Sequence, residues 1–137
     1  TIIDYLVNTS RSFIFSTALS PADIGAALAA LQLLATDASV LGRLQANVNY
    51  MADQLLSMGI DATNETPIFP ILIGSNEDTL AVSDYLYEAG IIGTAIRPPT
   101  VPIGESRIRL TVTAAHDKEQ IDYVCQSLHK AMKQLDS

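Results

Sequence analysis

Arginines cluster in one short part of this acidic chain, because Arg97, Arg107 and Arg109 are three of its five arginines. Arg107 and Arg109 fall on one side of an alternating segment, and Arg97 directly precedes a proline-rich loop that contains Thr100. A guanidinium holds a carboxylate by two parallel hydrogen bonds, so this grouping predicts an anion site. Alternatively, these arginines pair with some of the 15 acidic side chains at the surface, an interpretation that composition favours at least equally.

Two adjacent hydroxyl residues, Ser16 and Thr17, form a second candidate site. They follow the apolar run 13–15, which the pattern predicts to be a short extended segment. Hydroxyl and amide donors at the end of such a segment suit a phosphate group. Serine and threonine just before a helix are more often simple caps, so the phosphate interpretation is weak on these residues alone.

His116 and Cys125 have ordinary structural interpretations. The pattern places no acidic partner against His116, so we expect this side chain to cap a helix or pack in a bend rather than act as a base. Cys125 falls in the apolar stripe of the last predicted helix, where a small core residue is expected. Because Cys125 is the only cysteine, an intramolecular disulfide is excluded, and two separated histidines argue against a structural zinc site.

The first half of the chain is predicted to be helical. Apolar residues at helical spacing indicate a helix over 2–7, and we expect further residues to precede it, since the chain starts without Met. A second helix over 21–35 is apolar around most of its circumference, which is typical of a helix buried on more than one side. A third helix begins at Asp37 or Ser39 and ends at Gly59.

The second half alternates strands and helices. Strands are predicted over 66–74, 91–96 and 107–113, and helices over 75–90 and from Asp117 onward. Two prolines place the strand over 66–74 at an edge of the sheet, and the clean alternation over 107–113 predicts a half-buried strand. This order of elements predicts an α/β (α+β) domain in which helices cover one face of a short sheet.

Charge and hydropathy exclude several classes of protein. The formal net charge is −7, which argues against binding to nucleic acid or to an anionic membrane, since both need a basic surface. Hydrophobic residues make up 48% of the chain, enough for a core. No apolar run approaches the roughly 20 residues that span a bilayer, and no signal-peptide pattern is present. With a single cysteine, these features predict a cytoplasmic protein.

Four segments resemble the carboxyl-terminal third of the α-oxoamine synthases, and the resemblance extends over essentially the whole chain. They are Ser12–Pro21, Gly93–Pro102, Arg107–Thr111 and Thr113–His116. Members of this family are fold-type-I pyridoxal-phosphate enzymes that condense an amino acid with an acyl thioester and release carbon dioxide. The proline loop Ile96–Pro102 is most similar to the branch that joins L-alanine to pimeloyl-CoA or to a pimeloyl carrier protein in biotin biosynthesis.

The resemblance implies roles for the candidate residues. Arg109 matches the arginine that binds the α-carboxylate of the amino acid, and Thr100 matches a substrate-contacting threonine in the proline loop. Arg97 is placed to help bind the acyl or carboxylate end of the substrate. Ser16 and Thr17 match a hydroxyl pair that reaches the cofactor phosphate of the neighbouring subunit, which implies a homodimer.

The resemblance also implies what the chain lacks. The lysine that binds the cofactor covalently in this family lies upstream of the matching region, whereas Lys118, Lys130 and Lys133 belong to the last predicted helix. Arg107 is expected to be a structural partner only. We therefore expect this chain to supply substrate-binding and dimer-contact residues, to contain no catalytic residue and to be inactive alone.

The resemblance divides the chain at its second predicted helix. Residues 1–36 are expected to contain the end of the large cofactor-binding domain and the interdomain helix, and residues 37–137 to form the small domain. The short, mostly antiparallel sheet of the small domain is expected to follow two long helices. Two alternatives stay open: a part of another branch, such as 2-amino-3-oxobutyrate CoA ligase, or a free-standing carboxylate-binding module over 66–137 without catalysis. The apolar helix over 21–35 argues against the module, because such a surface is costly when exposed.

Overall fold

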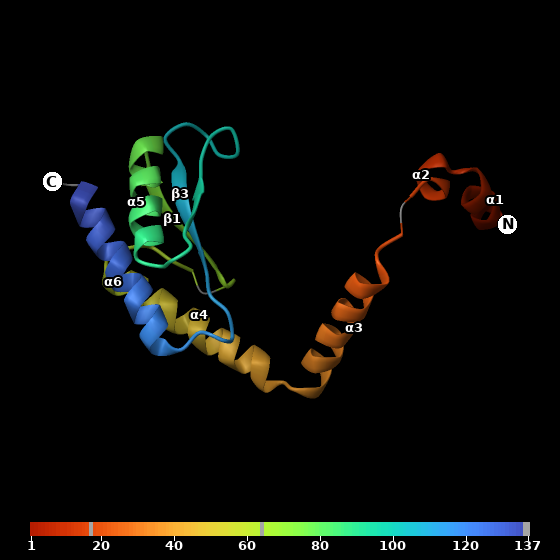
Figure 1. Cartoon of the computed structure of the whole chain (residues 1–137), viewed down its shortest axis with the longest axis horizontal. Helices are drawn as coiled ribbons and strands as arrows, with labels where there is room; N and C mark the ends of the chain where they lie inside the picture. Colours follow the sequence, from red (N-terminus) through yellow and green to blue (C-terminus); the bar gives the residue numbers. More distant parts are fainter. Residues whose placement is uncertain (17, 64, 136–137) are drawn as a thin grey trace. The chain divides into compact units, whose positions relative to one another are not determined.

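The computed structural model describes residues 1–16, 18–63 and 65–135. These residues divide into two compact units, Thr1–Ala38 and Ser39–Ser137. The described residues of the first unit form helices and their connections, whereas those of the second unit form three helices and a three-stranded sheet (Figure 1). The predicted α/β fold class, with an antiparallel sheet, is therefore confirmed for the second unit.

The first unit contains helices α1 (Ile2–Thr9), α2 (Arg11–Ile14) and α3 (Pro21–Thr36). The start of α3 confirms the predicted cap, because the Ser20 hydroxyl accepts a hydrogen bond from the Asp23 amide at 3.2 Å and a proline follows the cap. No residue of α3 is buried within the described chain, so the burial that its apolar composition indicates stays a prediction.

The predicted extended run over 13–15 is wrong. Ser10 accepts backbone hydrogen bonds from the amides of Phe13 and Ile14 at 3.0 and 2.9 Å, and these bonds close the single helical turn of α2. A short apolar run carries no periodicity, so its residue types do not distinguish a strand from a helical turn.

The second unit places three helices on one face of an antiparallel sheet. Strand β3 is central, between the two edge strands, in the order β1-β3-β2. The prediction that prolines confine the first strand to an edge is therefore confirmed. The elements are α4 (Ser39–Ser57), β1 (Ile68–Gly74), α5 (Asn76–Glu88), β2 (Thr94–Ile96), β3 (Ser106–Thr111) and α6 (Lys118–Leu135).

Side-chain caps begin two of these helices where the sequence predicted them. The Ser75 hydroxyl accepts from the Asp78 amide at 3.0 Å at the start of α5. The Asp117 carboxylate accepts from the Gln120 amide at 2.8 Å at the start of α6. In the part of the chain that the structure describes, no single helix is long and apolar enough to cross a membrane, and only α3 and α4 taken together meet that length and composition.

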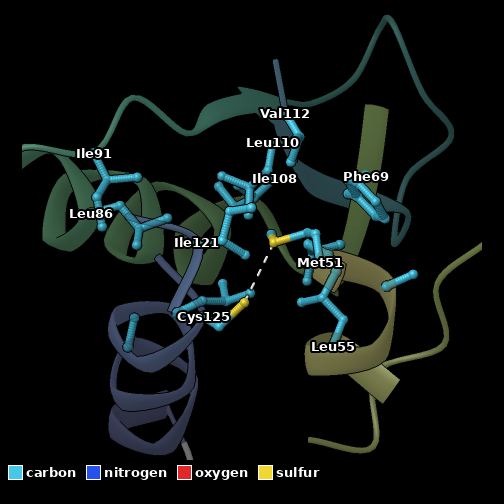
Figure 2. Close-up of a cluster of buried hydrophobic side chains, with 14 of the residues drawn as sticks. Met51, Leu55, Phe69, Leu86, Ile91, Ile108, Leu110, Val112, Ile121 and Cys125 are labelled. Atoms are coloured by element: carbon cyan, nitrogen blue, oxygen red, sulfur yellow. Dashed lines mark hydrogen bonds between the residues drawn. The ribbon is translucent and has the colours of Figure 1, made fainter. Parts of the chain in front are cut away.

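The core lies between the sheet and the helices. Helix α5 contacts all three strands, and α6 packs against α4 and α5. Alternate residues of the strands point into this layer, which confirms the half-buried strand predicted around Ile108 and Leu110 (Figure 2). The core side chains from strands and helices include Met51, Leu55, Phe69, Ile71, Leu86, Ile108, Leu110, Val112, Ile121 and Cys125.

Strand β2 is shorter than the predicted strand over 91–96, because its first half packs against α5. Gly93 sits so close to the core that a Cβ atom there would lie 3.0 Å from Leu86 and 3.1 Å from Ile108. Its carbonyl accepts a hydrogen bond from the Ser83 hydroxyl of α5 at 2.9 Å. These contacts draw the segment toward the helix, so pairing with β3 begins only at Thr94.

Candidate functional site

The central strand carries two arginines on the face of the sheet that points away from the helices. Ile108 and Leu110 are buried on the core side, and alternation therefore places Arg107 and Arg109 on the opposite face. Arg109 is exposed. The sheet thus holds both guanidinium groups on one open surface, as the sequence predicted.

The two arginines differ in their partners. Arg107 donates from Nε to the Glu105 carbonyl and from Nη2 to the Glu105 carboxylate, each at 3.0 Å. The guanidinium of Arg109 forms no hydrogen bond or ion pair with any residue that the structure describes. The surface-pairing interpretation therefore holds for Arg107, while the donors of the Arg109 guanidinium have no partner among the described residues.

The register of the sheet defines what surrounds Arg109. Pro70 lies opposite it on β1, and Thr94 lies opposite it on β2. The corresponding neighbours of Arg107 are Leu72 and Ile96. The sequence did not single out Thr94. The residue pattern of the strand over 91–96 indicates which side chains share a face, but it does not determine which residue of β3 each one pairs with.

The proline loop is anchored at both ends. Arg97 directly follows β2, and its carbonyl accepts a hydrogen bond from the Thr100 amide at 3.0 Å across the cis Pro98–Pro99 bond. At the far end, the fully buried Ser106 donates to the Asn76 side chain of α5 at 2.6 Å. The side chains of Arg97 and Thr100 are exposed.

The predicted phosphate residues lie in the first unit. The Ser16 hydroxyl donates to the carbonyl of Phe13 at 3.0 Å and is exposed. Thr17 lies outside the described residues. Ser16 therefore closes the turn after α2, and its exposed hydroxyl oxygen is accessible to solvent.

His116 has a structural role. Its Nδ1 atom accepts a hydrogen bond from the Thr113 amide at 3.2 Å, so the ring holds the bend between β3 and α6. Asn47 of α4 donates from Nδ2 to the carbonyls of Thr113 and His116, at 3.0 and 2.7 Å. The predicted placement of His116 in a bend is confirmed.

Cys125 is a core residue, also as predicted. Its sulfur lies 3.4 Å from the Met51 sulfur inside the buried cluster (Figure 2). Burial, with a smaller contribution from the charge of Asp122, raises the pKa of the Cys125 thiol to about 11. A buried, protonated thiol is not a nucleophile at neutral pH.

The described residues hold neither a metal site nor a lysine on the open face of the sheet. No group of three His, Cys, Asp or Glu side chains among them is close enough to bind a metal. All three lysines belong to α6, and Lys118 lies over the Tyr50 ring of α4, with Nζ 5.1 Å from the ring centre.

A pocket of about 550 Å³ lies elsewhere in the second unit. Its walls include Ile92, Val112 and Ile121, together with His116. No arginine, lysine or carboxylate lines it. Arg97, Arg107 and Arg109 therefore lie outside the lining of this mostly apolar pocket.

Comparison with known proteins identifies the family to which the chain is similar. A sequence model of the family described as "Aminotransferase class I and II" matches residues 1–128. The 8-amino-7-oxononanoate synthase of Petrotoga mobilis is 39% identical over 135 residues, which is 98% of this chain and 34% of the relative. The one of Thermoanaerobacter pseudethanolicus is 38% identical, with the same two coverages. The chain therefore spans about a third of the length of the curated relatives it matches.

Solved structures show the same fold. An 8-amino-7-oxononanoate synthase from Francisella tularensis superposes with a TM-score of 0.78 at 25% identity, over 99% of this chain and 40% of that one. The serine palmitoyltransferase of Sphingomonas wittichii gives a TM-score of 0.85 at 22% identity, over 98% of this chain and 34% of that one. A serine palmitoyltransferase variant from S. paucimobilis, solved with a bound PLP–myriocin aldimine, gives a TM-score of 0.83 at 24% identity, over 92% of this chain and 32% of that one.

Proposed function

The chain belongs to the aminotransferase class I and II family, and we propose that it is one part of a pyridoxal-phosphate-dependent α-oxoamine synthase, an 8-amino-7-oxononanoate synthase. The intact enzyme would join L-alanine to a pimeloyl thioester with loss of carbon dioxide, a step of biotin biosynthesis. Identities near 40% to relatives of that name support this branch. Because the chain spans a third of them, the activity is proposed for the intact protein.

The observation that carries the proposal is the guanidinium of Arg109. It projects from the central strand on the open face and lacks any partner among the described residues, beside an arginine that already has one. We assign it to the α-carboxylate of L-alanine, which it would hold by two parallel hydrogen bonds. A carboxylate fixed in this way orients the bonds at the α-carbon, and such orientation is worth several kcal/mol of activation barrier.

The cofactor does not fit the described residues as a covalent ligand. No lysine stands on the open face, and all three lysines belong to α6. When bound, pyridoxal phosphate withdraws electrons from the α-carbon of the amino acid. We propose that the lysine which holds it lies in the portion of the protein outside this chain, so that this chain alone is inactive.

The other predicted residues take supporting roles in this proposal. Thr100 would contact the substrate from the anchored proline loop, and Arg97 would bind its acyl or carboxylate end. Ser16 and Thr17 would reach the cofactor phosphate of the partner subunit in a homodimer. The exposed side chains of Arg97, Thr100 and Ser16 are consistent with contacts to groups beyond this chain.

We further propose that residues 1–36 complete the large domain, that residues 37–137 form the small domain, and that the enzyme works in the cytoplasm. The free, buried thiol of Cys125 supports a reducing setting. The net charge of −7 argues against nucleic-acid and membrane partners. The acyl donor would be either pimeloyl-CoA or pimeloyl carrier protein.

The proposal is tested by product analysis on the intact protein. The purified enzyme with pyridoxal phosphate is incubated with pimeloyl-CoA and L-alanine, glycine or L-serine, and the products are identified by mass spectrometry. We expect 8-amino-7-oxononanoate from L-alanine and much slower reaction with the other two amino acids. Preferred use of glycine or serine would assign another branch, and no condensation with any amino acid would overturn the enzyme proposal.

The inactivity of the chain alone has its own test. The 137-residue chain is mixed with pyridoxal phosphate and reduced with borohydride, and any labelled lysine is located by peptide mapping. We expect no stoichiometric labelling of a single lysine. Specific labelling of Lys118, Lys130 or Lys133 would show that the reaction centre lies in this chain.

A further inference from the structure

Thr94 of β2 lies directly opposite Arg109 on the neighbouring strand β3. The antiparallel register pairs Thr94 of β2 with Arg109 of β3, so both side chains stand on the open face. Cβ atoms of directly opposed residues lie about 4.5–5.5 Å apart. Thr94 and Arg109 are both exposed, and no hydrogen bond joins their side chains in the described part of the chain.

The sequence surrounds the two arginines of this face differently. Arg107 lies between the apolar side chains of Leu72 and Ile96, and its charge is met by Glu105 of its own strand end. Arg109 has a proline on one side and a hydroxyl on the other. A hydroxyl thus stands beside the arginine that lacks a carboxylate partner among the described residues.

We propose that Thr94 is a positioning residue for the carboxylate site. When the substrate carboxylate binds, the Thr94 hydroxyl oxygen accepts a hydrogen bond from Nε of Arg109, so that the two terminal nitrogens of the guanidinium meet the carboxylate together. An arginine has five N–H donors in a fixed planar fork, so fixing Nε fixes the direction of the remaining four. This inference rests on the proposed function and names α-amino carboxylates as the class that the pair recognises.

Thr100 and Arg97, the other two predicted substrate residues, do not pair with Arg109 in the sheet. Thr100 lies in the proline loop beyond the end of β2. Arg97 follows Ile96, whose partner on β3 is Arg107 rather than Arg109. Within the paired part of β2, the hydroxyl at the level of Arg109 belongs to Thr94.

The test compares Thr94→Val, which removes the hydroxyl and keeps the shape, with Thr94→Ser, which keeps the hydroxyl. Both are made in the intact enzyme, with Thr111→Val as the matched control, since Thr111 lies on the same face opposite Ile68. Calorimetry measures binding of L-alanine and of L-alaninamide, which lacks the carboxylate, and kinetics give KM and kcat. Melting temperatures verify that each variant is folded.

We expect Thr94→Val to weaken L-alanine binding and raise its KM by about three- to tenfold, which corresponds to the net contribution of one ordinary hydrogen bond. Binding of the amide and kcat should change much less, and Thr94→Ser and Thr111→Val should both resemble the parent enzyme. Unchanged L-alanine binding in Thr94→Val would overturn the inference, as would equal losses for acid and amide. Should Thr94→Val fail to fold, Thr94→Ala is judged by the same criteria.

Combination with Arg109→Ala separates this inference from the proposed function. If Thr94 acts through Arg109, the Thr94→Val effect disappears in the Arg109→Ala background. An effect that persists there assigns Thr94 another role and overturns the inference. If Arg109→Ala alone leaves the preference for acid over amide intact, the carboxylate role in the proposed function is wrong. If it removes that preference while Thr94→Val does not, only the inference about Thr94 fails.

Discussion

Asn47 of α4 donates a hydrogen bond to the carbonyl oxygen of His116 at 2.7 Å, across 69 positions of the sequence. The same Nδ2 atom donates to the Thr113 carbonyl at 3.0 Å. One amide group therefore ties the bend between β3 and α6 to the helix beneath it. Because this bend follows the strand that carries Arg109, it also fixes where the central strand ends.

Replacement of Asn47 by alanine leaves two carbonyl groups without their side-chain donor. We expect the free energy of unfolding to fall by about 1–3 kcal/mol, measured by urea unfolding of the chain. Gln126→Ala on α6 is the control, since this exposed amide should contribute within about 0.5 kcal/mol. Equal stabilities of the Asn47→Ala and Gln126→Ala variants would show that the bend does not depend on α4.

Gly93→Ala tests the close packing that shortens β2. An added Cβ would lie 3.0 Å from Leu86 and 3.1 Å from Ile108, so we expect a loss of about 1–3 kcal/mol in unfolding free energy, as for other overpacked cores. Gly42→Ala is the matched control, because nothing lies within 4 Å of that position in helix α4. There alanine should stabilise by roughly 0.5–1 kcal/mol. A stable Gly93→Ala variant would contradict the packing explanation.

Cys125 should make stability depend on alkaline pH. Burial raises the pKa of its thiol from 9.0 to about 11, so the folded chain retains a proton that the unfolded chain releases. The resulting stabilisation is complete below pH 9 and is lost as the pH rises toward 11. Urea unfolding between pH 8 and about 11 should show this decline.

Cys125→Ala is the control for the alkaline decline. Tyr50 donates to the Asp122 carboxylate at 2.8 Å, and this hydrogen bond raises the pKa of the phenol. The alanine variant should therefore keep a shallower decline that comes from Tyr50. Native Cys125 should also react slowly with iodoacetamide at pH 8 and rapidly once unfolded. Fast labelling of the native chain would show that the thiol is accessible.

The sequence predicted local structure correctly where a residue pattern is compatible with only one local conformation. The alternation around Ile108 and Arg109 has a single half-buried arrangement, and the caps at Ser75 and Asp117 bind amides within their own turn. Local signals of this kind depend only on neighbouring residues. They sufficed to place the arginines on one face of a strand.

Long-range relationships were not predictable from the same patterns. The pairing of Thr94 with Arg109 depends on strand register, and the bond from Asn47 to His116 on how α4 crosses the bend. The length of β2 was misjudged because Gly93 is held by side chains of α5, which lie outside any local window. An apolar run without a period also left 13–15 ambiguous.

Arg109→Ala in the intact enzyme tests the site itself. Loss of a bidentate, charge-assisted contact should raise the KM for L-alanine by about ten- to a hundredfold, while the KM for the acyl thioester changes little. Arg107→Ala is the control, because its guanidinium is bound to Glu105 at the strand end. It should leave alanine kinetics within about twofold, since an exposed ion pair contributes little. Arg109→Lys should fall between the two, because an ammonium retains the charge without the planar fork. Alanine kinetics unchanged by Arg109→Ala, or changed equally by both alanine variants, would mean that this face of the sheet does not bind the amino-acid carboxylate.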